Sequence, residues 1–337
     1  MNKRYFATRT VQMLVTFVAV ITLSFALIWL MPGGPAALIR AQFEQQARPM
    51  SEQEIAARVE LYTSVNPDKP IPAAYLDYVS AVLTGDLGES IWYDRTVAEI
   101  LADAMPWTIF LSAVSMLLIY AIGIALGALM AYYEASKFDF SSSTASIVIT
   151  SIPFYVVAVA LLWFLGYTLG WFPTSGRVNP NLAPGLTVAF VQSVIYHGAL
   201  PIASLVIAGF GGTALSMRGN AIQVLGDDYM RVARLRGLSE RRISLTYVAR
   251  NSILPMYTGI MISIGYLFGG SIILEQIFTY RGAGYYVFSS LGARDYPLLM
   301  GGFLLITLGV VFGVYIADMT YGMVDPRAGS GADRESF

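Results

Sequence analysis

Residues 11–31 read VQMLVTFVAVITLSFALIWLM, an uninterrupted apolar stretch that follows three basic residues among the first nine. A helix of this length covers the hydrocarbon core of a membrane, which is about 30 Å thick. A secretory signal has a shorter core of about 7–15 residues and a cleavage site of small residues, whereas this stretch runs directly into Pro32. The sequence therefore predicts a retained membrane-spanning helix over residues 1–32.

The composition of the whole chain indicates that its main solvent is lipid. Its 337 residues are 56% hydrophobic and only 13% charged, whereas soluble domains carry about 25% charged residues. Five further apolar runs are each long enough to span a membrane. They cover residues 106–131, 145–170, 198–217, 253–274 and 297–320. The fold class expected is all-α integral membrane, with six spans and a kink at Pro153 in the third.

The segment between the first two spans is polar and acidic, with eleven acidic against five basic residues over positions 33–105. Residues 51–62 and 71–83 have helical periodicity, which predicts a small folded cap over 33–96. A loosely ordered loop is the alternative. The membrane core then covers 97–322, and a tail follows over 323–337.

The distribution of basic residues predicts the orientation in the membrane. With six spans, 13 of the 21 Lys and Arg residues fall on the side of both termini, and the acidic first loop falls on the other side. Short cytoplasmic loops carry an excess of Lys and Arg, so both termini are expected in the cytoplasm. The run 198–217 is the weakest, and the two termini would lie on opposite sides if it did not span.

Several kinds of chemistry have no supporting motif in this sequence. It contains no cysteine, one histidine (His197, expected at a membrane boundary), no GxxxxGK[ST] loop for nucleotides and no HExxH metal motif. We therefore expect no catalytic residues, metal or cofactor, and an intramembrane hydrolase is disfavoured. The net charge of −1 gives no reason to expect nucleic acid as a partner. Few ionisable residues lie within the predicted spans, which argues against an ion-coupled carrier.

Small residues recur within the spans, including Gly123, Gly127, Gly209 and Gly211. Small residues four apart allow membrane helices to approach closely. The glycines therefore predict tight packing, either against a second membrane subunit or within this chain.

The most informative loop reads DDYMRVARLRGLSERRISLTYVARNSILP over residues 227–255. Asp228 suits the start of a short helix, Arg236 suits its end, and Gly237 suits the left-handed residue that follows. Ser239 can cap a second helix. This first helix presents an apolar face that would fit a partner's groove, and we assign Tyr229, Val232 and Ala233 to it. The alternative is a basic patch that contacts anionic lipid.

These residues resemble the coupling motif of binding-protein-dependent ABC importer permeases, in the dipeptide, oligopeptide and nickel branch. Arg231-Val232-Ala233 occupies the EAA positions of that motif, Gly237 its glycine, and Leu254-Pro255 its end. Other similar stretches are PGGP (32–35), GDLGES (85–90), PTSG (173–176) and RDYP (294–297). The long first loop resembles that of B-type subunits, although NPDKP (66–70) departs from the usual Gly-Leu-Asp-x-Pro.

The resemblance implies a type I ABC importer permease fold in the inner membrane of a prokaryote, with a coupling loop over residues 219–252. It implies a heterodimer with a second permease, two cytoplasmic ATPase subunits or domains, and an extracytoplasmic solute-binding protein. Peptides are the implied cargo, with nickel or oligosaccharides as alternatives, and a non-transporting membrane scaffold is the alternative of a different class. The coupling residues implied are Asp228, Tyr229, Arg231, Val232, Ala233, Arg236, Gly237, Leu238, Ser239 and Pro255. No residue of the substrate pathway is assigned.

Overall fold

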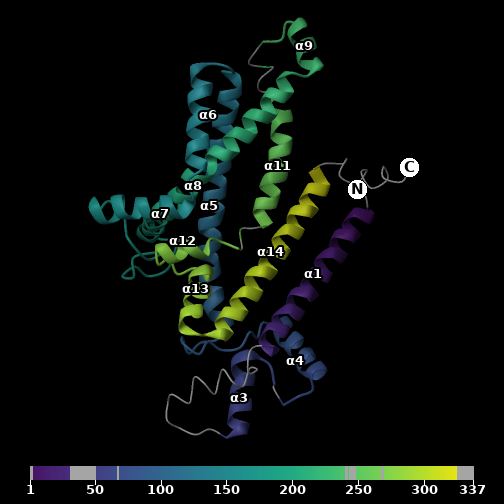
Figure 1. Cartoon of the computed structure of the whole chain (residues 1–337), viewed down its shortest axis with the longest axis vertical. Helices are drawn as coiled ribbons and strands as arrows, with labels where there is room; N and C mark the ends of the chain where they lie inside the picture. The colour runs from purple at the N-terminus through teal and green to yellow at the C-terminus, as the bar shows by residue number, and fades with distance from the viewer. Residues whose placement is uncertain are drawn as a thin grey trace. The chain divides into compact units, whose positions relative to one another are not determined.

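A computed structural model describes residues 3–30, 51–66, 68–239, 242, 248–265, 267 and 269–324. Within these ranges the chain is helical, and the one β-type pairing is an isolated bridge between Glu89 and Thr96. The expected all-α class is confirmed. The chain forms two compact units (Figure 1), which are Met1–Ile109 with Gly265–Gln276 and Arg281–Phe337, and Phe110–Ile264 with Ile277–Tyr280.

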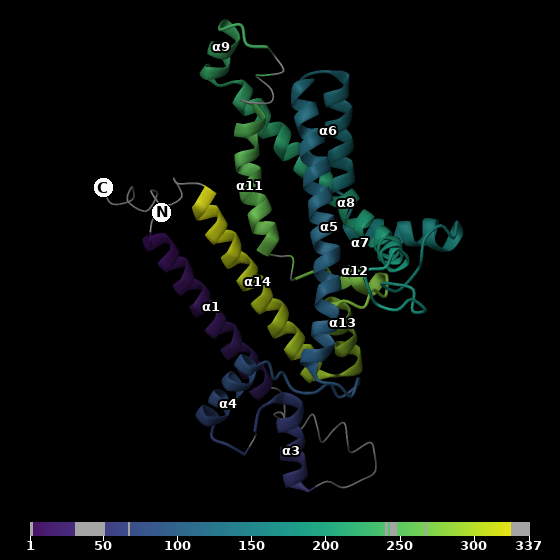
Figure 2. The same cartoon turned by 180° about the vertical axis from the view of Figure 1, so that it is seen from behind.

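The first unit is built on two long apolar helices that lie side by side (Figures 1 and 2), α1 (Lys3–Trp29) and α14 (Tyr296–Val324). Polar contacts join them near one end. The Thr10 and Tyr315 hydroxyls lie 3.0 Å apart, and an Arg9 guanidinium nitrogen lies 3.5 Å from the Asp318 carboxylate. The unit also contains α3 (Glu52–Thr63), α4 (Ile71–Thr84), α13 (Ala283–Ala293), the start of α5 (Val97–Tyr132) and most of α12 (Ile272–Ile277).

Four of the six predicted spans are single long helices among the described residues. They are α1, α5, α14 and α8 (Val188–Leu225), and each is long and apolar enough to cross a membrane. The weakest predicted run, 198–217, therefore lies within a longer helix. The run 253–274 corresponds to the 17-residue α11 (Ala249–Gly265) and residues beyond it, of which 266 and 268 lie outside the described part.

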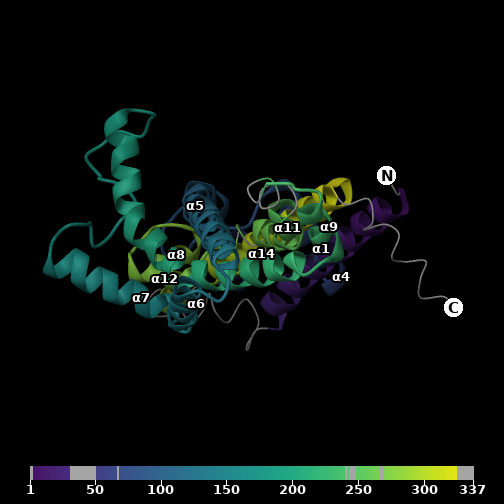
Figure 3. The ribbon, with the colours of Figure 1, turned by 90° about the horizontal axis from the view of Figure 1, so that it is seen from above.

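The predicted span 145–170 is not one continuous helix. It consists of α6 (Lys137–Thr150), α7 (Phe154–Leu161) and a π-helical turn, η2 (Leu162–Thr168), and the chain bends by 89° between α6 and α7 (Figure 3). Pro153 explains the position of the bend, because proline lacks a backbone N–H and disfavours helical geometry in the residue before it. The predicted position of the kink is confirmed, but the chain turns sharply there and does not continue as one kinked helix.

Glycines bring helices together within the second unit, as the intrachain alternative proposed. A Cβ atom built at Gly123 would lie 2.5 Å from the Thr213 Cβ, and one built at Gly211 would lie 2.7 Å from the Ser146 carbonyl oxygen. These approaches join α8 to α5 and to α6. The packing leaves no room for any side chain at these two positions.

The predicted cap helices are present as α3 and α4. Ser51 caps α3 in a reciprocal arrangement with Glu54. A hydrogen bond in the first unit joins two stretches that are far apart in the sequence, GDLGES (85–90) and RDYP (294–297). The Ser90 hydroxyl donates to an Asp295 carboxylate oxygen at 2.5 Å. The Trp92 backbone N–H donates to the same oxygen at 3.2 Å. These two hydrogen bonds hold the GDLGES and RDYP stretches together.

Candidate coupling loop

The candidate loop begins where α8 ends, at Leu225, and its described part contains the short helix α9 (Asp228–Leu235). Asp228 lies in the first turn of α9, as predicted, where its charge stabilises the exposed N–H groups. The expected segment 219–252 overlaps the end of α8, which continues to Leu225, and the start of α11, which begins at Ala249.

The inward face of α9 packs against the chain itself. Met230 is fully buried and Ala233 is 4% exposed, and both belong to a cluster that includes Ala131, Ala221 and Val248. The assignment of Ala233 to a docking face is therefore wrong. Its methyl group holds α9 against the ends of neighbouring membrane helices in the second unit.

The outward face of α9 carries three exposed apolar side chains, which we name the α9 patch: Tyr229, Val232 and Leu235. Their exposed fractions are 39%, 48% and 80%. Arg231 and Arg236 are also exposed. Leu235 was missed by the sequence analysis, although its spacing of three from Val232 places it beside that residue on a helix. An apolar patch beside arginines has the composition of an interface core with a charged rim.

Gly237 ends this helical region in the left-handed conformation that the sequence predicted. Its φ is +69°, and a Cβ atom built there would meet nothing within 4 Å. The next residue, the half-buried Leu238, donates its backbone N–H to the Ala233 carbonyl oxygen at 3.3 Å. The backbone geometry at this position therefore favours glycine and disfavours a β-branched residue.

The last two predicted loop residues have different surroundings. The Ser239 hydroxyl accepts a hydrogen bond from the Arg242 backbone N–H at 3.4 Å, as a helix cap does. The second helix expected from the sequence would fall mostly on 240, 241 and 243–247, which lie outside the described residues. Pro255 lies inside α11 and is exposed. Asn251, one turn earlier, contacts α9 by donating to the Tyr229 hydroxyl at 3.1 Å, and no sequence signal pointed to it.

An ion pair braces the helix that leads into the loop. The Arg218 guanidinium on α8 binds the Asp139 carboxylate on α6 in a bidentate manner, with Nη2–Oδ2 at 2.7 Å. Asp139 is 3% exposed and also accepts from the Ala135 backbone N–H at 3.1 Å. A buried carboxylate without its partner would cost about 3–5 kcal/mol. This pair therefore fixes α6 to α8 about two turns before α8 ends at Leu225.

A second buried acid lies in the first unit and holds three segments together. Glu275 is 1% exposed, and its carboxylate accepts from the Thr108 hydroxyl at 2.8 Å and from the Tyr285 backbone N–H at 2.9 Å. Few ionisable groups were expected in the membrane core from the sequence, and no role was expected for Glu275. Its contacts indicate a structural one.

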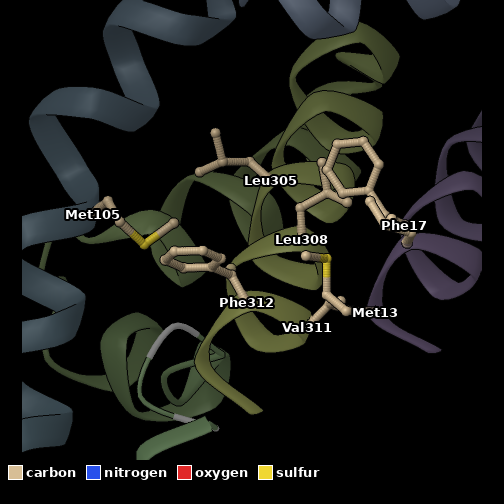
Figure 4. Close-up of a pocket in the computed structure, with 9 residues that line it drawn as sticks. Met13, Phe17, Met105, Leu305, Leu308, Val311 and Phe312 are labelled. Carbon is tan, nitrogen blue, oxygen red and sulfur yellow. The ribbon is translucent and has the colours of Figure 1, made fainter. Parts of the chain in front are cut away.

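The described part of the first unit also has an apolar cavity of about 460 Å³ between α1, α5 and α14 (Figure 4). It is lined by Met13, Leu14, Phe17, Met105, Leu305, Leu308, Gly309, Val311 and Phe312. None of these side chains offers a hydrogen bond or a charge. A peptide brings charged termini and amide groups, which are costly to bury unpaired. The cavity therefore does not fit a peptide, and the substrate pathway stays unassigned.

Fold and loop together define a multi-pass, all-helical membrane protein with an exposed helix placed between two membrane helices. Residues 123–330 match the family described as "Binding-protein-dependent transport system inner membrane component". That range includes α8, α9 and α11 and is more than half of the chain. The chain belongs to this family, so it is a transport permease that works with other components, including a binding protein.

Similar proteins align over nearly the whole chain. The di/tripeptide transport system permease protein DppB of Pseudomonas aeruginosa is 30% identical over 336 residues, which cover 96% of this chain and 98% of that protein. The oligopeptide transport system permease protein AppB of Bacillus subtilis is 32% identical over 324 residues, with the same coverage. The dipeptide transport system permease protein DppB of Escherichia coli is 29% identical over 329 residues, covering 93% and 94%.

Proposed function

We propose that this chain is the permease subunit of an ATP-driven importer and forms half of a translocation pathway for peptides. The α9 patch is the observation that carries this proposal. It is an apolar surface on a short helix that the rest of the second unit holds in place. The names of the similar proteins, which describe dipeptide, tripeptide and oligopeptide transport, support peptides as the cargo.

In this proposal the α9 patch docks into a groove of a cytoplasmic ATPase. ATP binding and hydrolysis take place in two ATPase subunits or domains, because this chain has no phosphate-binding motif. A second, homologous permease provides the other half of the pathway, and a solute-binding protein delivers the peptide. Met230 and Ala233 tie α9 to the membrane helices, so a movement of the ATPases would move those helices as a rigid body.

The proposed orientation of the chain in the membrane follows from the need for the α9 patch to reach a cytoplasmic ATPase. Both termini and the coupling loop would face the cytoplasm, where ATP is available, and the segment 33–96 would face the opposite side, where the binding protein acts. The excess of basic residues on the side of the termini supports this arrangement.

The proposed function is tested with the complete complex in vesicles, with the binding protein supplied on the appropriate side. A peptide library is expected to stimulate ATP hydrolysis and to accumulate inside the vesicles, whereas this chain alone is expected to hydrolyse no ATP. Nickel ions and an oligosaccharide mixture are the comparison substrates. Uptake of one of these without peptide uptake would contradict the peptide assignment, and an assembled complex that moves no solute would favour the scaffold.

A further inference from the structure

Helix α4 packs against the last turns of α1 (Figures 1 and 2). The Tyr75 and Thr22 hydroxyls lie 2.8 Å apart. The Phe25 ring lies 5.4 Å from the Tyr75 ring and 5.7 Å from the Tyr78 ring, between centroids. Tyr78 is 4% exposed, so this contact is a tight one.

The length of α1 indicates the depth of this contact in the membrane. Arg9, paired with Asp318, marks one boundary, since charged groups lie outside the hydrocarbon. A core of about 30 Å and a rise of about 1.5 Å per residue place the other boundary roughly 20 residues further on, near Trp29. Thr22 precedes Trp29 by seven residues, or about 10 Å. The α4 contact therefore lies within the hydrocarbon-spanning part of α1.

Helix α14 provides a second measure of depth, taken from the same Arg9–Asp318 pair. Leu304 belongs to the same buried cluster as Phe25 and Tyr78. It lies 14 residues from Asp318 along α14, which corresponds to about 21 Å of helix. The cluster is thus roughly 9 Å short of the far boundary of a 30 Å core, in agreement with the distance given by α1.

The side of α4 that turns away from α1 is amphipathic. Leu76 and Leu83 are 66% and 64% exposed, and their spacing of seven residues places them on one stripe of the helix. Asp77 and Thr84, also seven residues apart, lie on the adjacent stripe and are exposed. The Asp77 carboxylate accepts from the Lys69 ammonium group at 2.7 Å. A stripe of exposed leucines beside a polar stripe is the pattern of a helix that lies in a membrane interface.

We infer that α4 lies in the interface of the membrane face at which α1 ends, with Leu76 and Leu83 among the acyl chains of that leaflet. Lipid is the occupant because the face is continuous with two spanning helices at a depth where hydrocarbon surrounds them. The polar stripe with Asp77 and Thr84 then faces the headgroups. Part of the 33–96 segment is consequently membrane-embedded rather than a cap in water, whatever the transported solute.

The absence of cysteine from the chain makes a direct test possible. Single-cysteine variants L76C, L83C, D77C and T84C of the full-length chain are labelled with a nitroxide before assembly into the complex, which is placed in vesicles of phosphatidylethanolamine and phosphatidylglycerol. Power saturation measures the accessibility of each label to oxygen, which concentrates in hydrocarbon, and to a water-soluble nickel chelate. The oxygen-to-nickel ratio is expected to be several-fold higher at positions 76 and 83 than at 77 and 84.

The matched control is L61C on α3, because Leu61 is also an exposed leucine, at 49%, but α3 lies beyond the end of α1 in Figures 1 and 2. Its label is expected to be accessible to nickel. If the labels at positions 83 and 61 have the same oxygen-to-nickel ratio, Leu83 faces water and the inference is overturned. Immobile labels at 76 and 83 that neither reagent reaches would overturn it in favour of a covering protein.

Discussion

Replacing Gly237 by valine is expected to uncouple ATP hydrolysis from transport while leaving the protein inserted and assembled. Gly237 has a φ of +69°, which a β-branched residue adopts only with strain. The cost is about 1–3 kcal/mol, and relief of that strain would turn or fray the end of α9. The space around the built Cβ is open, so no steric clash contributes. The measurement is peptide-stimulated ATP hydrolysis and peptide uptake by the reconstituted complex.

The control for this variant is Gly237→Asn, because asparagine tolerates the left-handed conformation. It is expected to couple nearly as well as the wild type. Co-purification of all subunits verifies that both variants assemble. A valine variant that assembles and transports like the wild type would show that the geometry at position 237 has no part in coupling.

Replacing Gly127 by alanine is expected to destabilise the second unit strongly. The added Cβ would clash with the Ala214 carbonyl oxygen and would lie 2.7 Å from the Met217 Cβ. A carbonyl oxygen of the helix backbone cannot rotate away, so α5 and α8 must separate. Overpacking of this kind costs about 1–3 kcal/mol and sometimes more. We expect the thermal unfolding midpoint of the detergent-solubilised chain to fall by several degrees.

Gly219→Ala is the matched control, because Gly219 also lies in α8 and a Cβ built there meets nothing within 4 Å. Alanine favours a helix over glycine by about 1 kcal/mol, so this variant should be at least as stable as the wild type. Equal unfolding midpoints for the two variants would mean that the close approach at Gly127 does not limit packing.

The membrane helices could be predicted from the sequence because each contains its own signal. A long apolar run such as 11–31 must cross the membrane as a helix, since its backbone has no other hydrogen-bond partners there. The position of the bend at Pro153 could be predicted from the sequence, but its angle could not. Proline fixes where the helix breaks, whereas the 89° angle depends on how α6 and α7 pack in the folded chain.

The face that α9 presents was the least predictable feature of the site. Helical periodicity correctly placed Tyr229 and Val232 together, but it also assigned Ala233 to their face. The rotation of α9 is set by the burial of Met230 against Ala221 on α8 and against Ala131 on α5, which lies 99 residues earlier in the chain. A short helix gives too few residues for a sequence pattern to decide which side faces inward.

Polar contacts between residues that are far apart in the sequence could not be predicted from local sequence patterns either. Arg218 and Asp139 are 79 residues apart, and Ser90 and Asp295 are 205 residues apart. The last two lie in motifs that the sequence analysis recognised, yet nothing in either motif indicated that they meet. Such pairs become visible only when the helices that carry them are placed.

The central claim, that the α9 patch contacts an ATPase, is tested most directly by cross-linking from Val232. A V232C variant of this cysteine-free chain is labelled with a benzophenone maleimide, assembled with its partners in vesicles and irradiated. Val232 is 48% exposed, so the label can attach without disturbing the buried cluster. We predict a covalent adduct between this chain and an ATPase subunit, and none from the same label at L61C. An adduct with the ATPase from position 61, or none from position 232 in an active complex, would contradict the account.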